Sequence, residues 1–82
     1  MIVENKEILK TLNDIFNDIF DDDLLILTSN TTAEDIEEWD SLNQIKLIIE
    51  CERAFNIRLK SRDINILDNI GEMVEHLSKV IG

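Results

Sequence analysis

The sequence predicts an all-α fold: a small four-helix bundle of three main helices and a short third helix, with a long loop between helices one and two. Apolar residues recur at helical spacing in three separate stretches. The chain has no proline, no tyrosine and only two glycines, so few positions break a helix or favour a sheet. Its 82 residues, 44% of them hydrophobic, suffice for one core, and we expect a single domain over residues 1–82.

The first helix is predicted from about Val3 to Phe20. Asn13 and Asn17 fall with charged residues on its polar side. The apolar residues share an arc about 140° wide, which is typical of a helix packed on one side of a core. They are Ile8, Leu9, Leu12, Ile15, Phe16, Ile19 and Phe20.

A long connection follows, from Asp21 to Asp40. It opens with three aspartates and an apolar cluster, Leu24 to Leu27. Thr31 and Glu34 have the spacing of a capping box, so one helical turn is expected near Thr32, and Ile36 and Trp39 are expected to pin the connection to the core. A connection of this length in a small domain usually has a functional role.

The second helix is predicted from Ser41 to about Phe55, with Asp40 as its N-cap. Its apolar residues span an arc of about 220°, which is too wide for a helix that lies on one side of a core. The helix is therefore either central or has part of its apolar face exposed for a partner. The narrow polar face holds Lys46, Glu50 and Arg53, spaced to form the pairs Lys46–Glu50 and Glu50–Arg53.

Two further helices complete the prediction. Ser61 is suited to cap a short helical turn through Ile66. Asn69 and Glu72 have capping-box spacing at the start of the last helix. The apolar residues of that helix share an arc about 120° wide; they are Ile70, Met73, Val74, Leu77, Val80 and Ile81.

The formal net charge of −10 restricts the classes of partner. Binding to nucleic acid or to an anionic membrane needs Lys and Arg facing phosphates, so neither is expected. Self-repulsion at this charge favours a monomer, and partners with basic patches. The chain has no secretory signal pattern and no apolar run of 18 residues, and its single cysteine fits a reducing compartment, so we expect a cytoplasmic protein without membrane insertion.

Residues that typically carry catalysis or bind metal are sparse. The only histidine, His76, lies at the shoulder of the last apolar stripe, and Cys51 lies in the apolar arc of the second helix, where an inert buried thiol is expected. The run Asp21–Asp23 lacks the alternating ligands and central glycine of a calcium loop. We therefore predict no catalytic residue, no metal site and no enzymatic activity.

The tetrapeptide Trp39-Asp40-Ser41-Leu42 is the most informative motif. It places Ser41 at the first position of a helix, after an acidic cap and a long polar loop. A group attached to the hydroxyl would project from the helix N-terminus, where free N–H groups and the macrodipole favour a phosphodiester anion. Taken alone, the tetrapeptide favours an ordinary capping or first-turn serine, because serine is common at helix starts.

The segment from Glu37 to Leu59, EEWDSLNQIKLIIECERAFNIRL, resembles the signature region of acyl carrier proteins and their peptidyl carrier relatives. Asp-Ser-Leu opens a helix, apolar residues follow at fixed offsets and a phenylalanine precedes a short connection; the matching positions are Asp40, Ser41, Leu42, Ile45, Ile48, Cys51 and Phe55. The resemblance extends more weakly over nearly the whole chain.

The resemblance implies that Ser41 carries phosphopantetheine, added from coenzyme A by a magnesium-dependent phosphopantetheinyl transferase. The thiol of that arm then holds an acyl or aminoacyl group as a thioester, for loading, synthase and transferase enzymes. It also implies that partners recognise the serine and the helix after it, a face that maps here to Asp40, Leu42, Lys46, Ile49, Glu52 and Arg53.

The chain departs from fatty-acid carriers at Lys46 and Arg53, where those proteins usually or often hold acidic residues. Trp39 before Asp-Ser-Leu looks more like carriers of polyketide, nonribosomal peptide or surface-glycan assembly. We therefore favour a specialised pathway over housekeeping fatty-acid synthesis. Two alternatives stay open: a non-carrying acidic helical interaction module that binds a partner helix, and, more distantly, a small hydrolase with His76 as the base of Ser41.

Overall fold

The computed structural model describes residues 4–36, 39–65 and 67–81, and over these residues the chain is helical with no strand. The α-helices are α1 (Asn5–Ile19), α2 (Ser41–Phe55), α3 (Ser61–Asn65) and α4 (Ile70–Ile81). A short 3₁₀ helix, η1 (Ala33–Asp35), lies in the long connection. The predicted all-α fold with three main helices and a short third is confirmed. Two residues placed at the ends of predicted helices, Val3 and Ile66, lie outside the described residues.

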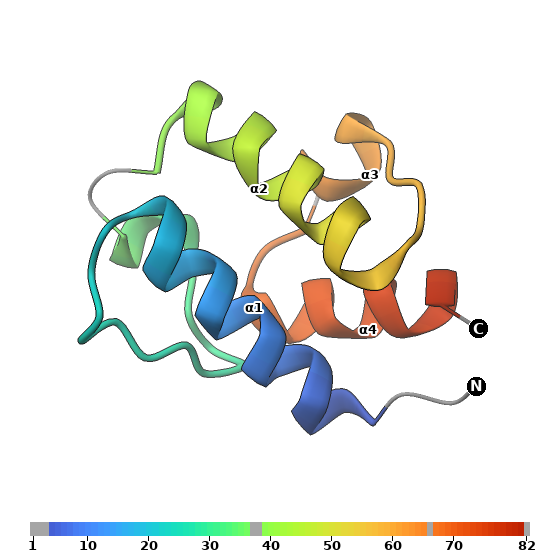
Figure 1. Cartoon of the computed structure of the whole chain (residues 1–82), viewed down its shortest axis with the longest axis horizontal. Coiled ribbons are helices and arrows are strands. Elements are labelled where there is room, and N and C mark those ends of the chain that lie inside the picture. The colour runs from blue at the N-terminus through green and yellow to red at the C-terminus, as the bar shows by residue number, and fades with distance from the viewer. Residues whose placement is uncertain (1–3, 37–38, 66, 82) are drawn as a thin grey trace.

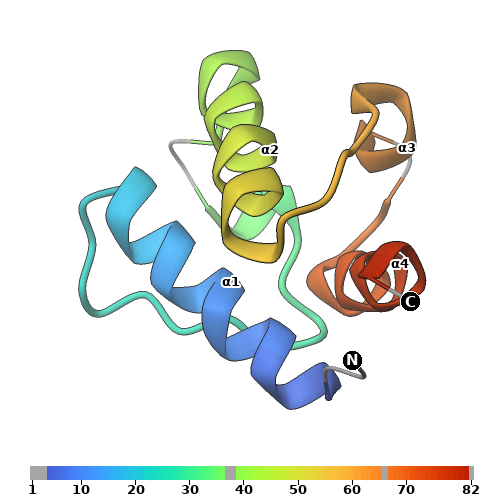
Figure 2. The same ribbon diagram turned by 45° about the vertical axis from the view of Figure 1, so that its right-hand side comes forward.

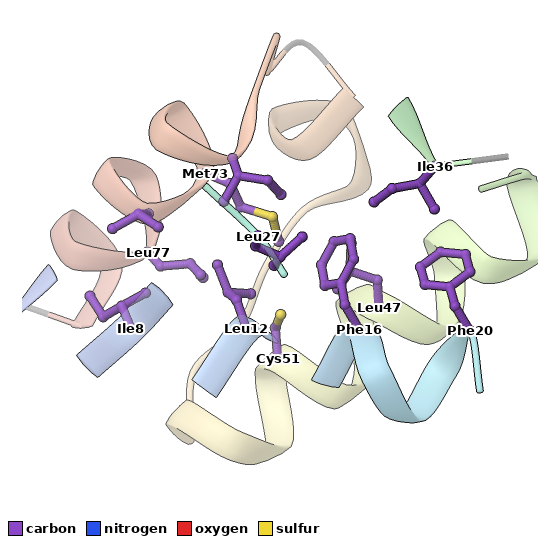
Figure 3. Close-up of a cluster of buried hydrophobic side chains, with 12 residues drawn as sticks. Ile8, Leu12, Phe16, Phe20, Leu27, Ile36, Leu47, Cys51, Met73 and Leu77 are labelled. Carbon is purple, nitrogen blue, oxygen red and sulfur yellow. The ribbon is translucent and has the colours of Figure 1, made fainter. Parts of the chain in front are cut away.

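The helices pack around one hydrophobic core. α1 runs antiparallel to α2 and also contacts α4, so the C-terminal end of α1 and the N-terminal end of α2 share one end of the bundle (Figures 1 and 2). The core side chains come from α1, α2, α4 and the long connection (Figure 3). The buried residues of this cluster are Ile8, Leu12, Phe16, Phe20, Leu27, Ile36, Leu47, Cys51, Ile70, Met73, Val74 and Leu77.

Two asparagines of α1 hold the first part of the long connection in place. Asn13 Oδ1 accepts the backbone N–H of Leu27 at 2.6 Å, and Asn13 Nδ2 donates to the carbonyl of Leu25 at 3.0 Å. Asn17 Nδ2 donates to the same Leu25 carbonyl at 2.9 Å and to that of Asp22 at 2.7 Å. The sequence pattern predicts that both side-chain amides face solvent. In the structure they instead form hydrogen bonds with backbone N–H and C=O groups of the connection, which has no regular secondary structure there to provide partners.

The apolar cluster of this connection divides between core and solvent. Leu27 is buried and Leu25 is half-buried, whereas Leu24 and Ile26 are 89% and 78% exposed. Of the four residues, only Leu27 and Leu25 therefore contribute to the core.

The second part of the connection is joined to α4. The first N–H groups of α4 lack acceptors within the helix, and loop carbonyls supply them: Ile70 donates to Thr31 at 2.8 Å and Gly71 donates to Ser29 at 2.9 Å. A Cβ at Gly71 would lie 3.0 Å from the Ser29 carbonyl oxygen, so a glycine permits this close approach. Asn69 Oδ1 accepts the N–H of Glu72 at 2.9 Å, as the predicted cap requires.

The capping box in the connection is shifted by one residue from the predicted pair. Thr32 and Asp35 form it, not Thr31 and Glu34, and the Thr32 N–H donates to Asp35 Oδ2 at 3.0 Å. Thr31 instead uses its hydroxyl to accept the N–H of Thr28 at 2.9 Å. Both pairs have the same sequence spacing, so the spacing alone does not distinguish them. The tertiary structure does, because the Thr31 carbonyl accepts the N–H of Ile70 at the start of α4.

Candidate functional site

The N-terminus of α2 is formed by a short set of hydrogen bonds around Asp40. Asp40 Oδ1 accepts the backbone N–H of Asn43 at 2.9 Å, and the Asp40 carbonyl accepts that of Gln44 at 2.9 Å. Asp40 itself has extended backbone angles, so the chain turns into the helix at Ser41. These contacts fix Ser41 as the first helical residue, as the sequence predicts.

Ser41 is exposed, and so is the following Leu42. The helix offers no acceptor for the backbone N–H groups of these two residues, and the macrodipole places partial positive charge at the same point. An accessible hydroxyl beside such donors fits a phosphodiester anion, and no described side chain covers it. The residues present therefore fit a phosphopantetheine arm joined to Ser41.

Trp39 anchors the chain just before this helix. Its ring meets Phe16 edge-on, with centroids 5.2 Å apart, and lies 6.4 Å from the ring of Phe20. Its Nε1–H donates to Gln44 Oε1 at 2.6 Å, which joins the connection to the second turn of α2. Because Trp39 is tied to both α1 and α2, the position of Ser41, two residues further on, is set by the core.

The outer face of α2 carries an exposed apolar stripe. Leu42, Ile45 and Ile49 are 60%, 54% and 47% exposed, and their spacing places them on adjacent turns of one side. This explains the wide apolar arc of the helix, because part of that arc faces solvent. Ile45 was assigned to the apolar offsets of the signature and not to the partner face. Its position three residues after Leu42 and four before Ile49 was the available signal.

The other residues expected on the partner face do not all share one environment. Asp40, Lys46 and Arg53 are exposed. Glu52 is half-buried, and its carboxylate accepts the N–H of Leu59 at 2.9 Å, so it holds the connection after α2 as well as facing outward.

The predicted ion pairs on α2 are realised in part. Arg53 approaches Glu50 at 3.6 Å, between two partly exposed side chains. No pair between Lys46 and Glu50 forms among the residues that the structure describes. The Lys46 ammonium is therefore left to solvent, on the same helix as the apolar stripe.

Residues suited to other chemistries are not assembled into a site. Cys51 is fully buried, and its burial, followed by the nearby charges of Glu50 and Glu52, raises the pKa of its thiol to about 12. His76 makes no hydrogen bond to Ser41 within the described ranges. No metal-binding group of three or more His, Cys, Asp or Glu side chains forms in the same part of the chain. Among the described residues, none of the helices has the length and apolar character needed to span a membrane.

Comparison with known proteins identifies the class. Residues 10–77 match a family model described as "Phosphopantetheine attachment site". The four-helix fold and this match define a small helical carrier that bears phosphopantetheine.

A similar solved structure identifies the family within this class. The solution NMR structure of holo acyl carrier protein from Geobacter metallireducens is similar with a TM-score of 0.81 and 36% sequence identity, over 89% of this chain and 84% of that chain. The chain belongs to the acyl carrier protein family of phosphopantetheine-bearing proteins. No significant match is found among curated proteins. Members of this family are carriers and not enzymes, and they generally interact with phosphopantetheinyl transferases and synthase enzymes.

Proposed function

We propose that this protein carries acyl, aminoacyl or polyketide intermediates on a phosphopantetheine arm attached to Ser41, in a specialised biosynthetic pathway. The observation that supports this site is the exposed Ser41 at the capped N-terminus of α2, inside the segment that matches the family model. When attached, the arm supplies a terminal thiol that holds its cargo as a thioester.

The residues around Ser41 have separate roles in this proposal. Asp40 fixes the start of the helix through its bond to the Asn43 N–H, which leaves the N–H groups of Ser41 and Leu42 directed at an attached phosphodiester. Trp39 holds the preceding chain against Phe16, so a partner enzyme meets a serine in a defined position. A defined position matters because small displacements of a reacting group slow group transfer steeply.

We propose that partner enzymes dock on the outer face of α2. This face contains the apolar stripe of Leu42, Ile45 and Ile49 together with Asp40, Lys46, Glu52 and Arg53. Exposed apolar side chains surrounded by charges are typical of an interaction surface. The two basic residues lower the negative potential of the face, which weakens docking to the basic patches of fatty-acid synthesis enzymes and favours a specialised pathway.

Three further properties complete the proposal: domain organisation, oligomeric state and location. The three longer helices, α1, α2 and α4, share one core, consistent with a single carrier domain over residues 1–82. A net charge of −10 opposes self-association, so we propose a monomer. The free, buried Cys51 fits a reducing compartment, and we propose a cytoplasmic location.

Intact-mass spectrometry tests the attachment site. After incubation with coenzyme A, Mg²⁺ and a broad-specificity phosphopantetheinyl transferase, we expect the mass of one added phosphopantetheine. Ser41→Ala abolishes the addition, because no other hydroxyl is offered at the N-terminus of α2. Ser61→Ala is the matched control, since Ser61 is also exposed and also opens a helix, and it keeps the addition. An unmodified mass with several such transferases would favour the non-carrying interaction module.

A further inference from the structure

The charges of this chain are strongly segregated. Residues 53–62 hold four of its eight basic residues and no acidic residue, although the whole chain has a net charge of −10. Arg53 lies on α2, 3.6 Å from Glu50, so its charge is partly offset. The other three lie in the connection after α2 and in α3, and we call them the basic strip: Arg58, Lys60 and Arg62.

The side chains of the basic strip are exposed and unpaired. All three face solvent, whereas Ile57 and Leu59, which alternate with Arg58 and Lys60 along the chain, are half-buried against the core. Among the described residues, no carboxylate forms an ion pair with any member of the strip. The positive charge of the strip is therefore available to a partner.

Hydrogen bonds fix the backbone beneath the strip. The Glu52 carbonyl accepts the N–H of Ile57 at 3.1 Å, and the Glu52 carboxylate accepts the N–H of Leu59 at 2.9 Å. The Lys60 carbonyl accepts the N–H of Asp63 at 3.0 Å, in the first turn of α3. A surface whose backbone is already ordered loses less conformational entropy when a partner binds.

The strip lies on the way from the end of α2 back toward the attachment residue. The connection between α2 and α3 runs along the outside of the bundle (Figures 1 and 2). Three residues after Arg62, Asn65 Oδ1 accepts Gln44 Nε2 at 3.3 Å. This bond joins α3 to α2 within about one turn of Ser41. An enzyme that reaches Ser41 can therefore contact the strip as well.

The charges around the strip decide what kind of partner fits it. A nucleic acid or an anionic membrane is negative throughout, so it would also repel the acidic residues on the rest of the chain. A second copy of the chain would bring the same net charge of −10. A protein surface, by contrast, can be acidic opposite the strip and basic or neutral elsewhere. Guanidinium groups also match carboxylates in geometry, which suits the two arginines to a protein interface.

We propose that the basic strip docks an acidic surface patch on the enzyme that loads the phosphopantetheine arm. The proposal rests on Ser41 being the attachment residue, because the strip then lies beside an arm that this enzyme must reach. The loading enzyme must also distinguish this carrier from others. Charges at an interface mainly set the association rate and the choice of partner, so the strip supplies that discrimination.

The loading rate in a cell-free extract of the native host tests the proposal. The holo protein is added with ATP at low salt, and intact mass follows the appearance of the cargo. We expect the initial rate to fall about fivefold or more in the strip variant, because association with the acidic patch slows. The loss should shrink as salt is added. The strip variant carries Arg58→Gln, Lys60→Gln and Arg62→Gln.

A control variant separates the strip from net charge. It loses three exposed lysines of α1 and α4 and has the same net charge as the strip variant, and we expect its loading rate to change less than about twofold. Equal loading rates for the strip variant and the control overturn the proposal. The control variant carries Lys6→Gln, Lys10→Gln and Lys79→Gln.

A peptide tests the chemistry of the strip without the arm. The ¹⁵N-labelled apo protein is titrated with a soluble helical peptide rich in glutamate and with its glutamine counterpart. We expect only the glutamate peptide to shift the amide signals of residues 58–62, and to bind the strip variant about fivefold more weakly than the control variant. Shifts elsewhere in the chain, or equal binding to both variants, overturn the proposal.

Two further measurements identify a different occupant. Binding to phosphatidylglycerol vesicles that the strip variant loses, or dimerisation in sedimentation that it loses, would overturn the proposal in favour of a membrane or a second copy. A protein that accepts no phosphopantetheine would refute attachment at Ser41. A holo protein whose loading does not depend on the strip would refute only the docking of the acidic patch.

Discussion

At the scale of single residues, the carrier needs one reactive thiol and holds a second one out of reach. Cys51 belongs to the same core cluster as Leu12 and Leu47 and has no exposed surface (Figure 3). Only a thiolate attacks disulfides and thioesters efficiently, and a raised pKa suppresses the thiolate. The protein's own cysteine therefore does not compete with the thiol of the arm for acyl groups.

The reactivity of Cys51 toward a thiol reagent tests this. At pH 8 the apo protein is expected to react at least 100-fold more slowly than the same protein in denaturant, because the thiol has a pKa of about 12 and is buried. The phosphopantetheinylated protein should gain one fast-reacting thiol. Rapid modification of the folded apo protein would contradict the buried position, and Cys51→Ser identifies which thiol reacts.

The same shift has a defined pH dependence. Because the pKa of Cys51 rises from 9.0 to about 12 on folding, its contribution to stability is complete below pH 9. Above pH 9 the unfolded chain loses the proton first, so the free energy of unfolding falls between about pH 9 and pH 12. The cause is mainly the desolvation of the thiolate.

At the scale of elements, the long connection is positioned by side chains of the helices. Asn13 and Asn17 bind its backbone on one side, and the N-terminus of α4 binds it on the other. Through Trp39, the same connection leads into the start of α2. The order of the loop and the position of Ser41 are therefore linked.

Removing the amide of Asn13 tests this link. Asn13→Ala leaves the Leu27 N–H without its acceptor, and we expect a loss of about 1–3 kcal/mol in the free energy of unfolding, measured by urea denaturation. The amide proton of Leu27 should also exchange faster with solvent. Asp14→Ala, an exposed neighbour on the same helix, is the control and should change stability by less than about 0.5 kcal/mol. Equal effects of the two variants would show that the loop does not depend on this amide.

At the scale of the whole molecule, the distribution of charge decides which partners approach. The chain has a net charge of −10, yet α2 presents the exposed side chains Lys46 and Arg53 beside an apolar stripe. Electrostatic complementarity mainly changes association rates and the choice of partner. If partners dock on α2 as proposed, the overall negative charge attracts basic enzymes, whereas Lys46 and Arg53 disfavour those that require an acidic helix.

Charge reversal tests this mismatch. For the holo protein bearing Lys46→Glu and Arg53→Glu, we expect kcat/KM with a bacterial fatty-acid malonyl transferase to rise about tenfold over that of the unchanged protein. The gain should shrink as salt is added, because screening weakens attraction between surface charges. Lys10→Glu with Lys79→Glu makes the same change in net charge on α1 and α4 and is the control. Equal rates for all three proteins would point to the housekeeping pathway.

Much of this architecture follows from local pattern. The helical spacing of apolar residues located α1, α2 and α4 along the sequence, and the caps Asp40 and Asn69 marked the starts of α2 and α4. Both signals are local, because periodicity and capping act within a few residues of sequence. The sequence also indicated Ser41, through the resemblance of the segment from Glu37 to Leu59 to the signature of acyl carrier proteins. A serine after an acidic cap at a helix start would not by itself have distinguished it from an ordinary first-turn residue. The width of the apolar arc indicated that part of α2 faces solvent.

Only the tertiary structure decided which residues of that arc are exposed and what the polar side chains bind. Ile45 faces solvent while Ile48 is buried, Glu52 binds the Leu59 N–H, and Asn13 binds the loop instead of water. The approach of α3 to the start of α2 likewise depends on side chains of both helices. These features arise from contacts between segments far apart in sequence. The apolar periodicity of one helix does not specify which other segments pack against it.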